Sequence, residues 1–140
     1  MNDLLPHEDE TVQIVELSTE ECHRLLETNH FGRLGMTVGH QPTVIPVNYI
    51  LDGNDIVVRT DAGSTIHGVV GRRVAFEIDG IDQFNHSGWS VIAIGDAQLI
   101  TDGALDRARH LPLSSYEPGA KDLWVRLAAP AVTGRRIARP

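Results

Sequence analysis

The sequence of 140 residues predicts a mainly β domain: a small barrel of six to seven short antiparallel strands with two or three short helices. Two observations support this class. Short runs rich in Val, Ile, Thr and aromatic residues recur along the chain, and turn signals such as Asp52-Gly53 separate them. Helical periodicity is confined to brief stretches.

The beginning of the chain is acidic and polar, and we expect a flexible tail over residues 1–10. The remainder, 11–140, is expected to fold as a single domain, because a chain of this length supports one hydrophobic core. Ser18 and Glu21 have the spacing of a capping box, which predicts that the first helix runs over Thr19–Thr28.

The predicted strands alternate apolar and polar residues, and Phe31–Val38 is an example. Asp52-Gly53-Asn54 predicts a hairpin turn, since Gly adopts positive φ without a steric clash. Gly88–Ile100 is apolar on both faces, which predicts burial on both sides, and Gly95 within it predicts a bulge or bend. Other expected elements are strands at Thr43–Leu51, Asp55–Thr60, Arg72–Ile78 (ended by a turn at Asp79-Gly80), Leu123–Leu127 and Ala131–Ile137, and short helices at Ser64–Val70 and Ala104–His110.

Composition narrows the function. A net charge of −7 argues against general nucleic-acid binding, which needs a basic surface, although it leaves room for one local positive pocket. The single cysteine, Cys22, forbids an internal disulfide, and the seven histidines lack metal-ligand spacing, so we expect no metal site. The chain shows no secretory signal and no apolar run long enough to span a membrane, and we expect a cytoplasmic protein.

A candidate anion site follows the predicted strand Asp55–Thr60. Arg59 and Thr60 end this strand, and a Gly-Ser turn then opens a predicted helix at Ser64. A guanidinium, hydroxyls and the bare N–H groups of a helix start together suit a phosphate. The alternative is an ordinary solvated strand edge. No nucleophile or nucleotide-loop motif occurs, so the catalytic residues are unknown and the residues alone do not identify a reaction.

Four segments occur in order that resemble the pyridoxamine 5′-phosphate oxidase-like flavin-binding proteins: LSTEECHRLLETNHFGRLGM, PTVIPVNYILDGNDIVVRTDAGS, VAFEIDGIDQFNHSGWSVIAIGDAQLI and VTGRRI. The chain is similar in particular to short actinobacterial members with FGRL, PVNY, RT-x-x-G and GWSV-x-x-x-G signatures. The resemblance covers about residues 14–137.

This resemblance implies a split β-barrel that forms a homodimer, with FMN in a groove between the subunits and a small-molecule substrate. By motif, Ile45, Pro46, Val47 and Asn48 would line the flavin ring. Arg59, Thr60, Ser64 and Thr65 would form the phosphate site. Trp89 and Ser90 would approach the flavin from the partner subunit.

Thr65 stands where the family commonly has Lys or Arg. The loss of one charge-assisted hydrogen bond would cost about 1.5–3 kcal/mol of binding. The resemblance therefore leaves four functions open. They are an FMN-dependent oxidoreductase, a flavin-binding or storage module without turnover, a deazaflavin-dependent reductase, and a dimeric scaffold that has lost its cofactor.

Overall fold

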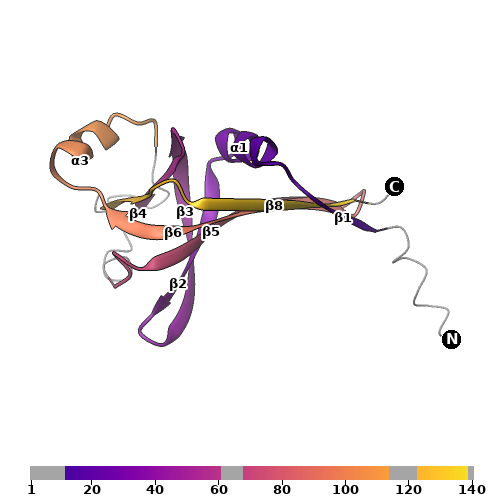
Figure 1. Ribbon diagram of the computed structural model, residues 1–140, viewed down its shortest axis with the longest axis horizontal. Coiled ribbons are helices and arrows are strands. Elements are labelled where there is room, and N and C mark those ends of the chain that lie inside the picture. The colour runs from indigo at the N-terminus through magenta and orange to yellow at the C-terminus, as the bar shows by residue number, and fades with distance from the viewer. Residues whose placement is uncertain (1–11, 61–67, 114–122, 139–140) are drawn as a thin grey trace.

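The structure, a computed structural model, describes residues 12–60, 68–113 and 123–138 (Figure 1). These residues form eight strands and two helices, which confirms the predicted mainly β class. The predicted tail over 1–10 and most of the predicted helix Ser64–Val70 lie outside the described residues. The elements are β1 (Gln13–Glu16), α1 (Thr19–Thr28), β2 (Phe31–Val38), β3 (Gln41–Asp52), β4 (Asp55–Thr60), β5 (Arg73–Asp82), β6 (Ser87–Leu99), α3 (Asp102–Ala108), β7 (Leu123–Leu127) and β8 (Ala131–Ala138).

All the strand pairs are antiparallel, in the order β1-β8-β6-β5-β2-β3-β4-β7, and β6 also pairs with β7. This last pairing closes β6, β5, β2, β3, β4 and β7 into a ring, while β8 and β1 extend outward from β6. The arrangement is a split β-barrel, as the sequence predicts. Ring closure leaves fewer open strand edges, which would otherwise expose unpaired backbone groups.

The split occurs along one edge of β6. Its residues Gly88–Ile94 pair with β8, and its residues Ala97–Leu99 pair with β7. Gly95 lies between the two, where an added Cβ would be 3.2 Å from Pro130 Cβ in the connection from β7 to β8. The ladder between β5 and β6 continues through Gly95 without an extra residue, so the predicted bulge is absent from that ladder. This glycine instead marks the exchange of partners and gives the β7–β8 connection room to pass.

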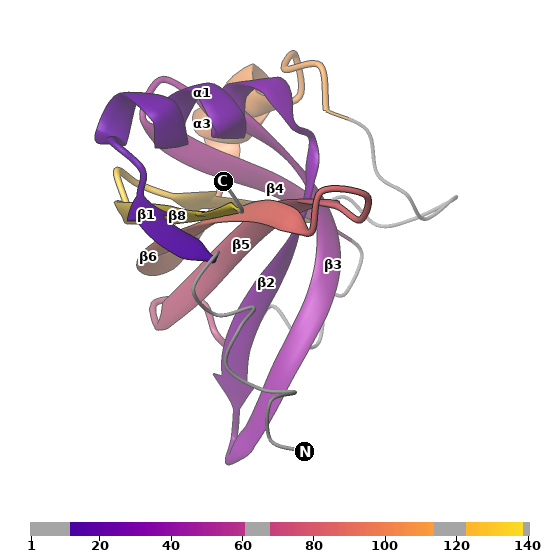
Figure 2. The same cartoon turned by 90° about the vertical axis from the view of Figure 1, so that its right-hand side faces the viewer.

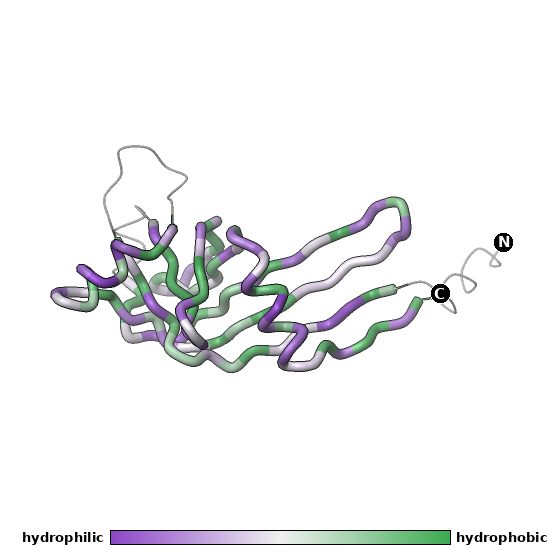
Figure 3. Tube along the Cα trace, turned by 90° about the horizontal axis from the view of Figure 1, so that it is seen from above, coloured by the Kyte–Doolittle hydropathy of each residue, from purple (hydrophilic) through white to green (hydrophobic). Residues whose placement is uncertain are grey.

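The strands alternate hydrophobic and hydrophilic residues along the trace (Figure 3), and their apolar faces fill the barrel. Helix α1 covers one opening of the barrel, away from the tip of the β2–β3 hairpin (Figure 2). The predicted capping box is present at Ser18 and Glu21. Cys22 and Leu26 are buried on the inner face of α1. No helix in the described ranges is long and apolar enough to cross a membrane.

Helix α3 lies against the outer face of the barrel. It forms a second apolar cluster with Val57 of β4 and Trp124 of β7, whereas Ile56 and Val58 point into the barrel core. Both faces of β4 are therefore buried, one in the barrel core and one under α3. This second cluster holds the end of β4, where the sequence predicts an anion site.

Two sequence expectations about β5 and β6 are wrong. Asp79-Gly80 is no turn, because β5 continues to Asp82, and its last residues have partners on the longer β6. The turn comes after Asp82, whose carboxylate accepts hydrogen bonds from the backbone N–H groups of Phe84 and Asn85. Strand β6 is also not buried on both faces of the chain, since Ile92 and Ile94 are 38% and 42% exposed.

Candidate functional site

The strand register brings Asn48, Arg59 and Trp124 into one row. Asn48 of β3 lies opposite Arg59 of β4, and Arg59 lies opposite Trp124 of β7. Residues directly opposite each other in a sheet point to the same face, so these three side chains share the outer face of the barrel. The sequence predicts Asn48 and Arg59 as site residues, and the structure places them side by side.

Arg59 is held in place by the segment after α3. Its guanidinium donates a hydrogen bond of 3.1 Å to the carbonyl oxygen of Leu113 and lies 5.4 Å from the centre of the Trp124 ring. Both contacts restrict a long side chain that would otherwise be free to rotate. Sequence reasoning missed Leu113 and Trp124, because both are more than fifty positions from Arg59 and match no motif.

The Trp124 side chain is buried beside Arg59. Trp124 is 2% exposed, and its indole N–H is buried with no hydrogen-bond partner among the described residues. A buried donor without an acceptor is costly and calls for an explanation. The Arg59 guanidinium lies over the face of this ring, and it is the group of this pair that suits a negative charge.

The other predicted phosphate residues are only partly described. Thr60 ends β4, where it pairs with Leu123 of β7. Ser64 and Thr65 lie outside the described residues. The described half of the candidate cradle therefore consists of Arg59 and the strand end at Thr60.

The predicted ring-lining residues occupy the middle of β3. Val47 is 3% exposed and belongs to the barrel core, where Ile45 packs against the same cluster. Pro46 and Asn48 point to the outer face, and Pro46 is exposed. Only the backbone and the two outer side chains of this segment can contact a ligand on the outer face.

Trp89 and Ser90 lie on the part of β6 that pairs with β8 and not with β7, so the path along the sheet from them to β4 crosses β5, β2 and β3. At the usual strand spacing this is about 19 Å along the sheet. The two side chains also point to opposite faces of β6, and each lines a different groove. A single chain therefore does not bring Trp89 or Ser90 to Arg59.

An acidic pair lies on the same outer face. Arg33 of β2 contacts Glu77 at 3.1 Å and Asp79 at 3.3 Å on β5. Burial raises the pKa of Glu77 above its ordinary value, and the hydrogen bond and charge of Asp79 raise it further, whereas Arg33 acts in the opposite direction. The register of β2 and β5 brings the Arg33 guanidinium between the two acids.

These observations define a split β-barrel protein with a candidate anion site at the end of β4. The particular family follows from sequence comparison. The chain belongs to the pyridoxamine 5′-phosphate oxidase family, whose sequence profile matches residues 18–136.

Similar proteins span nearly the whole chain. The FAD binding protein from Mycobacterium smegmatis is 31% identical, with a TM-score of 0.73 over 90% of this chain and 98% of that chain. An uncharacterized protein from Mycobacterium tuberculosis is 30% identical over 131 residues, 89% of this chain and 86% of the relative. A FAD-binding protein from Mesorhizobium loti shares the fold at 24% identity, with a TM-score of 0.73 over 88% and 97% of the two chains.

Proposed function

We propose that this protein binds a flavin and carries out redox chemistry on a small molecule, as a homodimer in the cytoplasm. The observation that carries the proposal is the Arg59 site, where contacts with Leu113 and Trp124 hold a guanidinium in place at the end of β4. Family membership and the FAD-binding relative support it. FMN is the first candidate flavin. FAD is the second, because the similar protein from Mycobacterium smegmatis is a FAD binding protein.

In this proposal Arg59, Thr60, Ser64 and Thr65 hold the flavin phosphate. The ring lies along β3 at Ile45, Pro46, Val47 and Asn48. Leu113 and Trp124 hold Arg59 in one place before the ligand arrives, which lowers the entropic cost of forming its bonds to phosphate. The bound flavin supplies the electron transfer, while the protein binds and orients it.

A second copy of the chain would complete the site with Trp89 and Ser90 of the partner subunit. An apolar row on the outer face supports this dimer. Ile94, Ala75, Gly35 and Val44 are aligned across four neighbouring strands, and Ile94 and Val44 are 42% and 67% exposed. A contiguous exposed apolar surface of this kind marks an interaction site.

The cofactor proposal is tested by titrating purified protein with FMN and with FAD while following the flavin absorbance bands. We expect binding at micromolar concentration or tighter. Arg59→Gln should weaken it about tenfold to a hundredfold, because a charge-assisted hydrogen bond to phosphate is lost. Arg24→Gln is the matched control, since Arg24 is an exposed residue of α1 that belongs neither to the Arg59 site nor to the apolar row. Protein that binds neither flavin at micromolar concentration contradicts the proposal.

The same titration, extended to deazaflavin and followed by an assay of turnover, separates the alternatives. A storage module binds flavin, yet no electron donor and acceptor pair turns it over. A deazaflavin-dependent reductase binds deazaflavin more tightly than FMN in direct competition. A scaffold without cofactor stays dimeric and binds neither FMN, FAD nor deazaflavin.

The dimer is tested by light scattering after size exclusion. Ile94→Glu places a charge in the apolar row, and we expect a monomer that binds flavin more weakly because the partner's contribution is lost. Val15→Glu is the control, since Val15 is 50% exposed on β1 and lies outside the row. A wild-type protein that is monomeric at micromolar concentration contradicts this part of the proposal.

A further inference from the structure

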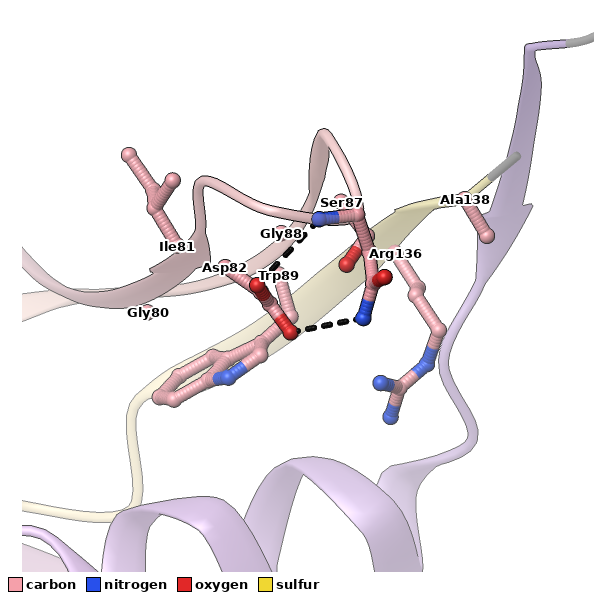
Figure 4. Close-up of a pocket in the computed structure, with 9 residues that line it drawn as sticks. Gly80, Ile81, Asp82, Ser87, Gly88, Trp89, Arg136 and Ala138 are labelled. Atoms are coloured by element: carbon pink, nitrogen blue, oxygen red, sulfur yellow. Dashed lines mark hydrogen bonds between the residues drawn. The ribbon is translucent and has the colours of Figure 1, made fainter.

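A groove of about 700 Å³ lies between the hairpin of β5 and β6 and the end of β8 (Figure 4). It is on the opposite face of β6 from Ser90 and from the apolar row described above. Pockets for small molecules usually measure about 300–1,000 Å³, so this groove has a suitable size. Four of its residues carry the argument: Gly80, Asp82, Trp89 and Arg136.

Trp89 forms a flat wall of the groove. Trp89 lies opposite Gly80 in the ladder of β5 and β6, and an added Cβ at Gly80 would be 2.6 Å from the indole nitrogen. The indole therefore lies directly on the backbone of β5, which only a glycine at this position allows. One side of the ring is covered by Gly80, and Trp89 also lines the groove.

Arg136 supplies a positive charge beside this ring. It lies opposite Trp89 in the ladder of β6 and β8, so both side chains are on the same face, and its guanidinium points into the groove (Figure 4). Arg136 is half-buried, and its side chain forms no hydrogen bond or ion pair with any residue in the described part of the chain. A guanidinium is a planar fork of donors that matches a carboxylate.

The nearby acids are already engaged. The carboxylate of Asp82 accepts hydrogen bonds from the backbone N–H groups of Phe84 and Asn85 and, at 2.8 Å, from the Asn85 side chain. Glu21 of α1 is bonded to Ser18 in the capping box. The hydrogen bonds of Ser18 are the main cause that lowers the pKa of Glu21, and the charge of Arg136 lowers it further from a distance. Neither Asp82 nor Glu21 forms an ion pair or hydrogen bond with Arg136. The positive charge therefore remains available to a ligand.

We propose that this groove binds a small, flat monoanion, namely an aromatic monocarboxylate. The ring of the ligand stacks on the Trp89 indole, and its carboxylate accepts two hydrogen bonds from Arg136. Asp82 in the same groove repels a second negative charge, so a monocarboxylate binds more tightly than a dicarboxylate. The groove lies apart from the Arg59 row of the same chain. Because Trp89 is also expected to contact a partner's flavin, benzoate binding is measured on protein without flavin.

Calorimetric titration with benzoate tests the proposal, with benzamide as the uncharged analogue and phthalate as the dianion. For so small a ligand we expect a millimolar dissociation constant for benzoate and weaker binding of both analogues. Arg136→Gln should weaken benzoate binding about tenfold to a hundredfold. Arg135→Gln is the matched control. It removes the same charge from the preceding residue of β8, whose side chain lines a groove on the opposite face.

Trp89→Leu provides a second variant, and it should also weaken benzoate binding, with the circular dichroism of each variant confirming its fold. Any of three results in the benzoate titrations would overturn the proposal, and a fourth comes from competition with FMN. The three are no benzoate binding at millimolar concentration, equal binding of benzoate and benzamide, or full affinity in Arg136→Gln. Displacement of benzoate by FMN, with FMN binding weakened by Arg136→Gln, would assign the groove to the flavin instead. Flavin binding is tested with the Arg59 variant and benzoate binding with the Arg136 variant. Failure of the flavin proposal is therefore distinguishable from failure of the benzoate proposal.

Discussion

The hydroxyl of Tyr49 is expected to contribute measurably to the stability of the barrel. It donates a 2.7 Å hydrogen bond to the carbonyl oxygen of Leu26, which connects β3 to α1, and the side chain is 1% exposed. Its ring packs edge to face on Phe76, with centroids 4.8 Å apart. Tyr49→Phe keeps the ring and removes only the buried hydrogen bond. We expect a loss of about 1–2 kcal/mol in the free energy of unfolding at neutral pH.

The same residue predicts a dependence on alkaline pH. Burial raises the pKa of Tyr49 well above its ordinary value of 10.0. As the pH rises above that ordinary value, the unfolded chain releases the Tyr49 proton while the folded chain retains it. The free energy of unfolding then falls with pH, by about 1.4 kcal/mol per pH unit for this group. Tyr49→Phe has no such proton to lose. The difference in the free energy of unfolding between wild type and variant should therefore become smaller above about pH 10.

Urea unfolding followed by circular dichroism, at neutral and at alkaline pH, measures both effects. Thr28→Ala is the control, because Thr28 is an exposed residue of α1 whose hydroxyl bonds to the Arg24 carbonyl. We expect it to change the free energy of unfolding by no more than about 0.5 kcal/mol. An unchanged midpoint in Tyr49→Phe, or a difference that widens as the pH rises, would refute the reasoning.

Three further outcomes are expected. Gly80→Ala should weaken benzoate binding severalfold in calorimetry, since the new Cβ displaces the Trp89 ring. Gly32→Ala should lower the free energy of unfolding in urea by about 1–3 kcal/mol, because its Cβ would be 2.6 Å from the Glu77 carbonyl oxygen, whereas Gly35→Ala on the same strand meets nothing closer than 3.7 Å and should cost less. Because the pKa of Glu77 is raised, the folded protein holds this proton more tightly than the unfolded chain, and the free energy of unfolding of the wild type falls as the pH rises through the raised pKa. Glu77→Gln should reduce this fall, as measured by urea unfolding between mildly acidic and neutral pH.

Much of the fold could be predicted because its signals are local. The capping box at Ser18 acts within one helical turn, and Asp52-Gly53 fixes a tight turn between adjacent strands. The Asp79-Gly80 dipeptide has a similar local signal and was misleading, since the longer β6 provides partners for both residues and keeps them extended. Pairing across the sheet outweighed the turn preference.

The candidate site shows the same division. The signatures around Asn48 and Arg59 are short and contiguous, so both residues could be identified from the sequence. The contacts of Arg59 with Leu113 and Trp124 could not, since they depend on how α3 packs against β4 and β7. Trp89 could be named as a candidate flavin contact from its motif, whereas the groove that it lines could not be predicted.

The amino-acid sequence by itself determined most of the strands, the turn at Asp52-Gly53, the capped helix and the family, because each is encoded in short runs of neighbouring residues. Only the tertiary structure decided the exchange of partners at Gly95, the row of Asn48, Arg59 and Trp124, and the meeting of Trp89 with Arg136. Those arrangements depend on the register between strands distant in sequence. Register is set by the packing of the whole barrel, which no local segment specifies.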